Sequence, residues 1–129
     1  MKPVFLICVT FAFLNSCSKY EGQGGAANIK GIVIEQKYNS LGNVIASYPA
    51  PNQSLYIIYG SENSFYDDDL KSSFDGSFEF RYLRKGTYRV FTYEDCNTCP
   101  SGKKEVISEV EITKKNQEVI MDTIYIKKL

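Results

Sequence analysis

The amino-acid sequence predicts an all-β protein, an antiparallel sandwich of about seven strands in two sheets. Three observations predict it. Phe78, Phe80 and Tyr82 alternate with charged residues, and this period of two gives a strand one buried and one solvated face. Turn residues recur at short intervals after residue 28, and no segment shows a convincing helical period. Ten tyrosines and eight phenylalanines also favour strands.

The first half of the folded part alternates short strands with turns. Residues 29–36 are rich in β-branched side chains and predict the first strand. Asn and Gly interrupt residues 38–44, and the two prolines of residues 48–51 exclude a helix there. Residues 53–60 are a nearly continuous apolar run, which is typical of a buried strand. A polar loop at residues 61–69 follows.

The second half contains the clearest strand signals. Asp75-Gly76 predicts a tight hairpin turn because glycine tolerates positive φ. Residues 84–86 predict another turn, and residues 104–112 and 117–126 predict two closing strands joined by a polar turn. The strand that follows the turn at residues 84–86 has two alternating sets of side chains, Tyr88, Val90 and Thr92 on one face and Arg89, Phe91 and Tyr93 on the other.

The N-terminal segment resembles a bacterial lipoprotein signal peptide. Lys2 precedes an uncharged apolar run of eleven residues at 4–14, shorter than the ~20 residues of a transmembrane helix but within the ~7–15 of a signal-peptide core. Leu14, Ser16 and Cys17 resemble a lipobox. The resemblance implies cleavage after Ser16 and attachment of acyl chains such as palmitate to Cys17, and more than one chain anchors a protein stably. The alternative is an ordinary secreted protein with Cys17 free.

These features divide the chain into a signal peptide (1–16), a flexible tether (17–28) and a β-sandwich domain (29–129). The tether has three glycines, two alanines and no apolar period. After cleavage, 113 residues would remain, enough for one domain with a modest core. Their 14 basic and 15 acidic side chains nearly balance, so we expect no nucleic-acid partner. The absence of histidine excludes Ser-His and Cys-His nucleophile pairs and His-ligated metals.

Residues 29–126 resemble a carboxypeptidase regulatory-like domain, a seven-stranded antiparallel immunoglobulin-like (transthyretin-like) sandwich. The resemblance is carried by IKGIVI, NQSLYIIY, SSFDGSFEFRYLRKGTYRVFTY and the closing EVISEVEI and EVIMDTIYI. Similar domains occur in surface and periplasmic lipoproteins of the Bacteroidetes type, and the family pattern carries no catalytic residues. The resemblance therefore implies a non-enzymatic accessory or binding module without a cofactor. With the lipobox, it places the chain in the cell envelope, anchored at the outer membrane and facing the periplasm or the surface.

Cys96 and Cys99 form a CxxC motif with three possible roles. A redox thiol usually lies at a helix N-terminus, whereas this pair follows a strand and precedes a Pro-Ser-Gly loop. Zinc requires about four ligands, which two cysteines without histidine would supply only by sharing between molecules. An exported location favours oxidation. We therefore expect a structural disulfide that fixes the shape of this loop.

Asp67, Asp68 and Asp69 offer carboxylates for Ca²⁺ or for acid–base catalysis. The spacing of an EF-hand is absent, and adjacent residues of a strand point to opposite faces, so three in a row converge only within a loop. We expect a solvated acidic loop rather than a metal site.

Several aromatic side chains are candidates for sugar binding, because an exposed aromatic face can stack on a sugar ring. The alternative, which we favour, is that they fill the core or cover strand faces. The end loops 61–69 and 94–103, or an exposed edge strand, are the surfaces where we expect a protein or glycan partner. A small enzyme using the CxxC or the acidic loop, and a structural subunit of a surface assembly, remain open. The aromatic candidates are Tyr56, Tyr59, Tyr66, Phe91 and Tyr93.

Overall fold

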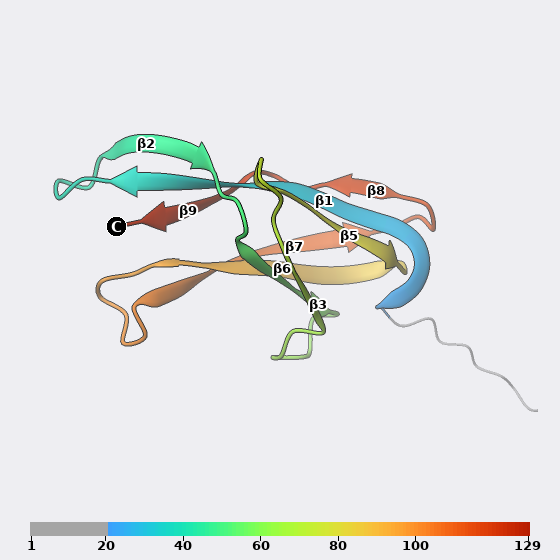
Figure 1. Ribbon diagram of the computed structural model, residues 1–129. Helices are drawn as coiled ribbons and strands as arrows, with labels where there is room; N and C mark the ends of the chain where they lie inside the picture. The colour runs from blue at the N-terminus through green and yellow to red at the C-terminus, as the bar shows by residue number, and fades with distance from the viewer. Residues whose placement is uncertain (1–20) are drawn as a thin grey trace, which may run out of the picture.

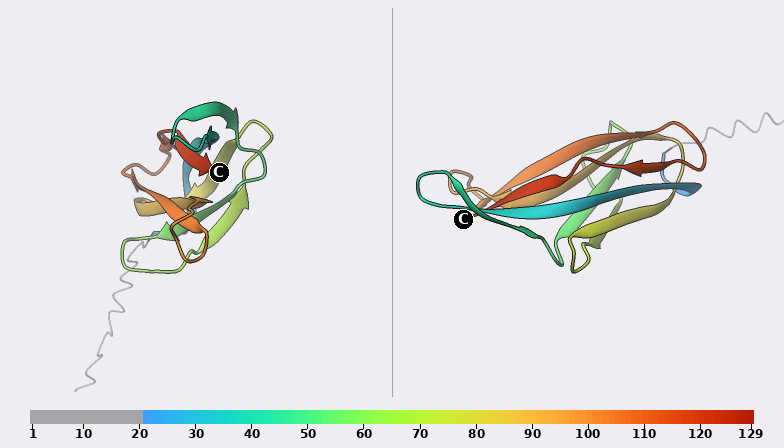
Figure 2. Two further views of the ribbon diagram at one scale, coloured as in Figure 1. Left: turned by 90° about the vertical axis from the view of Figure 1, so that its left-hand side faces the viewer. Right: turned by 90° about the horizontal axis from the view of Figure 1, so that it is seen from above.

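The computed structural model describes residues 21–129, and these form an elongated body of two stacked sheets without a helix (Figures 1 and 2). The all-β prediction is confirmed. One sheet contains β1, β2, β5, β8 and β9, and the other has the order β4-β3-β6-β7. The strands are β1 (Gln23–Tyr38), β2 (Val44–Pro49), β3 (Ser54–Tyr59), β4 (Asp68–Lys71), β5 (Ser77–Leu83), β6 (Gly86–Asp95), β7 (Lys103–Ile112), β8 (Glu118–Ile120) and β9 (Ile124–Lys128).

β1 is the centre of the five-stranded sheet. One of its edges pairs antiparallel with β5 and then, farther along, with β2. Val33 lies where the partner changes: its N–H donates to the carbonyl of Gly76 (2.8 Å), and its carbonyl accepts from the N–H of Ala50 (2.9 Å). The other edge pairs in parallel with β8 and then with β9. The sheet is therefore three strands wide along most of its length.

The strand count and the strand directions differ from the prediction. The described residues contain nine strands rather than about seven. β2 and β4 match none of the individually predicted strands, and the expected strand at 117–126 is divided into β8 and β9. Both of these run parallel to β1, so the sandwich is not purely antiparallel. β1 begins at Gln23, which places residues 23–28 of the expected tether in the sheet. The finer assignment to an immunoglobulin-like or transthyretin-like topology stays a prediction.

The core lies between the two sheets and contains the inward side chains of both. The alternation predicted for β6 is confirmed, since Tyr88, Val90 and Thr92 are fully buried. Thr92 is polar, and its hydroxyl donates to the carbonyl of Ser54 (2.7 Å), which satisfies it. The other largest fully buried side chains are Ile29, Val33, Leu55, Ile57, Leu83, Ile112 and Ile126.

Two glycines permit close approaches between strands. A Cβ on Gly31 of β1 would lie 2.5 Å from the ring of Phe78 on the neighbouring β5. Gly76 has a φ of 80°, and a Cβ there would lie 2.4 Å from the carbonyl oxygen of Val33. The predicted Asp75-Gly76 turn is therefore present. It is not a hairpin, however, because it joins β4 of one sheet to β5 of the other.

Tyr88 connects the start of the described chain to the corner between β5 and β6. Its buried hydroxyl donates to the carbonyl of Arg84 (2.6 Å) and accepts from the N–H of Gly22 (2.9 Å). A tyrosine corner of this kind is a feature of immunoglobulin-like sandwiches. The chain thus enters the body at one end, while the β1–β2 loop, the β6–β7 loop and the C-terminus lie at the opposite end (Figure 1).

Candidate functional site

The outer face of the four-stranded sheet carries an aromatic row. Tyr56 of β3 lies directly opposite Phe91 of β6, and their rings stack with centroids 5.0 Å apart and an interplanar angle of 19°. The row continues to Asp69 of β4 on one side and to Ile107 of β7 on the other. Side chains of opposed residues share a face, so these four positions form one line across all four strands.

Two further tyrosines complete what we call the aromatic cluster: Tyr56, Tyr66, Phe91 and Tyr93. The ring of Tyr66 lies 4.8 Å from that of Tyr56, and Tyr93 approaches both rings of the row edge-on, at 5.9 Å from Tyr56 and 5.8 Å from Phe91. Phe91 is only 6% exposed, whereas Tyr66 and Tyr93 are 51% and 39% exposed. The inner pair therefore supports two outer rings that solvent can reach.

The loop between β3 and β4 brings Tyr66 onto this face. Asp67 holds it at its end: its N–H donates to the carbonyl of Ile57 (2.8 Å), and its carboxylate accepts from the N–H of Tyr59 (2.7 Å). The guanidinium of Arg89 donates to the carbonyl of Asn63 within the same loop. These bonds give Tyr66 a defined position next to Tyr56.

Carboxylates border the aromatic cluster. Asp69 lies opposite Tyr56, and Glu105 lies opposite Tyr93. Partial burial, followed by the charge of Glu105, raises the pKa of Tyr93 above its usual 10.0, so the phenol is neutral at physiological pH. The site thus combines aromatic rings with carboxylate hydrogen-bond acceptors at its border.

Four of the five candidate aromatic residues are brought together by the fold: Tyr56, Tyr66, Phe91 and Tyr93. Tyr59 is not part of the cluster, because its ring packs edge-on against Tyr88 at 5.8 Å. The sequence contained the signal for Phe91 and Tyr93, whose positions alternate with the buried residues of β6. It held no signal for the carboxylates at the border, since these depend on the register between strands.

The candidate calcium ligands Asp67, Asp68 and Asp69 do not converge. Asp67 fixes the β3–β4 loop and Asp69 borders the aromatic cluster. One carboxylate oxygen of Asp68 accepts from the N–H of Asp69 (2.9 Å). Because β4 begins at Asp68, these last two side chains point to opposite faces. Residues 21–129 contain no group of three or more Cys, Asp or Glu arranged to hold a metal ion.

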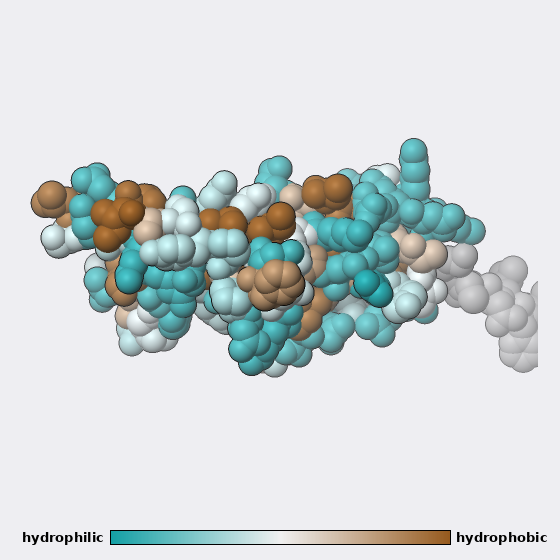
Figure 3. All heavy atoms as spheres, turned by 45° about the horizontal axis from the view of Figure 1, so that its top comes forward, coloured by the Kyte–Doolittle hydropathy of each residue, from teal (hydrophilic) through white to brown (hydrophobic). Residues whose placement is uncertain are grey.

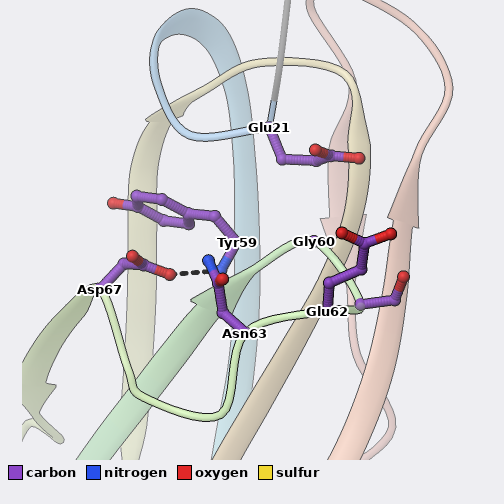
Figure 4. A pocket seen from close by; sticks show the side chains of 7 residues that line it. Glu21, Tyr59, Gly60, Glu62, Asn63 and Asp67 are labelled. Carbon is purple, nitrogen blue, oxygen red and sulfur yellow. Dashed lines mark hydrogen bonds between the residues drawn. The ribbon is translucent and has the colours of Figure 1, made fainter.

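A polar hollow of about 490 Å³ lies at the end where the chain enters the body (Figure 4). The hollow is lined by three carboxylates, Glu21, Glu62 and Asp67, and by Tyr59. Burial, followed by the nearby charges of Asp68 and Asp67, raises the pKa of Tyr59. Figure 4 shows Asp67 beside Tyr59, with Glu21 and Glu62 on the other side of the hollow. The remaining lining residues are Gly60, Ser61 and Asn63, and we assign no chemistry to this hollow.

Cys96 and Cys99 form a disulfide in the loop between β6 and β7. The N–H of Cys96 donates to the carbonyl of Gly102 (2.9 Å), which closes the loop. No helix adjoins the pair, so the usual means of stabilising a reactive thiolate is missing from this loop.

The predicted lipidation site, Cys17, lies outside the described residues. A membrane-spanning helix is absent from residues 21–129.

The fold and the site define a class of protein: an all-β body of two sheets that carries an aromatic cluster on one outer face. No family model matches the chain, and no curated protein sequence matches it. Its structure is similar to the crystal structure of a protein from Pseudomonas aeruginosa that is described as a "putative carbohydrate binding protein". The two chains are 11% identical with a TM-score of 0.50, over 83% of this chain and 91% of the other. At this identity the likeness concerns the fold alone.

Proposed function

We propose that the protein is a non-enzymatic binding module of the cell envelope that binds a glycan on its aromatic cluster. The observation that carries the proposal is the presence of two exposed rings, Tyr66 and Tyr93, on a stacked pair beneath them. A tyrosine ring offers an apolar face to the C–H surface of a sugar and a hydroxyl to its polar edge. The structural neighbour's description as a carbohydrate binding protein supports this proposal.

The charge at the site indicates which glycans fit. Asp69 and Glu105 accept hydrogen bonds, and sugar hydroxyls donate them. The same carboxylates repel uronic acids and sulfate esters. We therefore expect a neutral or amino-sugar polymer rather than an anionic one.

The lipobox supports an anchored location. Acylation of Cys17 would hold the protein at the membrane, and the resemblance to envelope lipoproteins points to the outer membrane. Acyl attachment is tested by mass spectrometry of the mature protein and by Cys17→Ser, which should release the protein from the membrane fraction. A mature chain without lipid would remove this part of the proposal.

The glycan proposal is tested on an array of neutral, amino and uronic polysaccharides, followed by titration calorimetry with the best of them. Tyr93→Ala and Tyr66→Ala should each weaken binding about tenfold, because truncating an aromatic anchor costs about 1–2 kcal/mol. Tyr125→Ala is the matched control, since Tyr125 is 54% exposed and lies in β9 of the other sheet. Absence of binding by the wild type to every glycan, or equal losses in all three variants, would refute it.

A further inference from the structure

Four basic side chains lie at the end of the body where the chain enters. Arg84 and Lys85 form the turn between β5 and β6, and Lys114 and Lys115 lie in the turn between β7 and β8. All four are exposed, and none of them forms a salt bridge with another residue of 21–129. We call these four side chains the basic end. Hydrophilic side chains cover much of this end of the molecule (Figure 3).

The fold brings both turns next to the start of the described chain. Gly86 of β6 pairs with Ile112 of β7, so the turns that adjoin these two residues lie side by side. The N–H of Arg84 donates to the carbonyl of Gly22 (2.8 Å), and the N–H of Gly22 donates to the hydroxyl of Tyr88 (2.9 Å). Figure 1 shows both turns at the end where the chain enters. The basic end is therefore fixed beside Gly22.

The length of chain before Gly22 limits how far the basic end can lie from Cys17. Gly22 comes five residues after Cys17, and five residues span at most about 18 Å. β1 alone has 16 residues, which at about 3.3 Å each run over roughly 50 Å. If Cys17 is acylated, Gly22 therefore lies within about 18 Å of the lipid anchor, whereas the opposite end of the body reaches the lipid only if the body lies flat.

The charges of the body favour an upright position over a flat one on an anionic lipid surface. Each Lys or Arg close to anionic headgroups strengthens binding about fivefold, the equivalent of about 1 kcal/mol. The outer face of the four-stranded sheet would instead present Asp69, Glu105 and Glu109, which the same headgroups repel. On the five-stranded sheet, Lys30 and Arg81 are each paired with a glutamate. The basic end is thus the surface near the anchor that complements anionic lipid.

We propose that the basic end docks on the anionic headgroups of the lipid surface that carries the anchor, and that this contact holds the body upright. Headgroup phosphates accept charge-assisted hydrogen bonds from Arg and Lys. The overall charge would not produce this orientation, because the whole chain has 15 basic and 15 acidic side chains; their arrangement produces it. The inference rests on the proposed acylation of Cys17 and is independent of the proposed glycan binding.

The test uses single-tryptophan reporters, because the chain has no tryptophan. The mature chain from Cys17, which contains the whole described body, is coupled through its Cys17 thiol to a maleimide lipid in vesicles. Cys96 and Cys99 are held in their disulfide and do not react. The coupling replaces native acylation, which mass spectrometry of the native protein decides separately. Failure of the anchor and failure of the docking are therefore distinguishable.

The two reporters lie at opposite ends of the body. Asn116→Trp lies in the β7–β8 turn of the basic end, and Leu41→Trp lies in the β1–β2 loop at the other end, where Leu41 is 82% exposed. Lipids that carry a nitroxide near the headgroup quench a tryptophan that touches the surface. Phosphatidylglycerol added to phosphatidylcholine vesicles should increase the quenching of Asn116→Trp and leave Leu41→Trp unchanged. Salt at about 1 M should abolish the increase, because it shortens the Debye length to about 3 Å.

Charge variants in the Asn116→Trp background identify the cations that make the contact. Lys114→Gln/Lys115→Gln should lower the ratio of docked to undocked protein about 25-fold, at about fivefold for each cation. Lys127→Gln/Lys128→Gln is the matched control, because it removes the same two charges from β9 at the opposite end. This control should keep the docking of the parent.

The β7–β8 turn should keep its shape in the charge variants, because the side chain of Gln117 accepts from the main-chain N–H groups of Thr113 and Lys114. If the double variant is nevertheless misfolded by circular dichroism, Lys85→Gln in the other turn decides the outcome with a loss of about fivefold. The proposal is overturned if phosphatidylglycerol does not increase the quenching of Asn116→Trp or if Leu41→Trp responds as strongly. Equal effects of the charge variants at the two ends would also overturn it.

Discussion

Replacing Tyr88 with Phe should destabilise the protein by about 1–3 kcal/mol. The ring stays and keeps its burial, so the loss is confined to the hydroxyl. That group donates to Arg84 at 2.6 Å and accepts from the N–H of Gly22 at 2.9 Å. Phenylalanine leaves a buried N–H and a carbonyl without their partner, and an unsatisfied buried polar group costs about 1–3 kcal/mol. The segment of the chain that precedes β1 would lose its attachment to the corner between β5 and β6.

Urea unfolding followed by circular dichroism measures this loss, since the chain has no tryptophan to report it by fluorescence. We expect a lower midpoint with an unchanged slope, and a melting temperature lower by roughly 4–8 °C per kcal/mol. Tyr125→Phe is the control, because that side chain is 54% exposed, and its effect should stay within about 0.5 kcal/mol. If Tyr88→Phe is as stable as this control, the hydroxyl does not hold the start of the chain.

Three further predictions concern the core, the distal loop and acid stability. Gly31→Ala should cost about 1–3 kcal/mol in urea unfolding, because its Cβ would overlap the ring of Phe78, and Phe78→Leu in the same chain should recover part of the loss. Cys96→Ser should lower stability by at most about 2 kcal/mol, since the closed loop is short, and a globally unfolded variant would contradict this. A hydrogen bond from Lys103 lowers the pKa of Asp95, so its contribution is present above the ordinary value of 3.8 and lost as the pH falls below it. In acid titration Asp95→Asn should therefore lose less stability than the wild type, and identical pH curves would show that the pair contributes nothing.

The strands that follow a simple alternation could be predicted from the sequence. Phe78 and Phe80 face the core from β5, and Tyr88, Val90 and Thr92 face it from β6, because alternate side chains of a strand lie on opposite faces. The alternation fails at Tyr82, which was expected on the buried face: it has a φ of 59° and is 65% exposed, and Leu83 is buried instead. β2 was missed because its residues are exposed on both faces and show no period. The parallel pairing of β8 and β9 with β1 was missed because composition does not specify the direction of the neighbouring strand.

The candidate site was predictable only in part, for a related reason. Phe91 and Tyr93 could be placed on one face from their spacing, but their contact with Tyr56 depends on the register between β3 and β6. Tyr66 reaches the same face through a loop whose path is fixed by hydrogen bonds between Asp67 and the main chain of β3. The expected tether extends to residue 28, whereas β1 already begins at Gln23. Gln23 joins the sheet by pairing with the neighbouring β5, and its glycine-rich sequence gives no sign of this pairing.

The chain enters the body at one end of its long axis, and the aromatic cluster lies on the flank. If Cys17 is held in a bilayer and the body stands upright on it, the rings face sideways rather than outward from the tip. Neighbouring copies in the same leaflet could then contact one long polymer at the same height above the lipid. Such a layer would retain a weakly bound chain by the number of its contacts, and a short oligosaccharide would escape it.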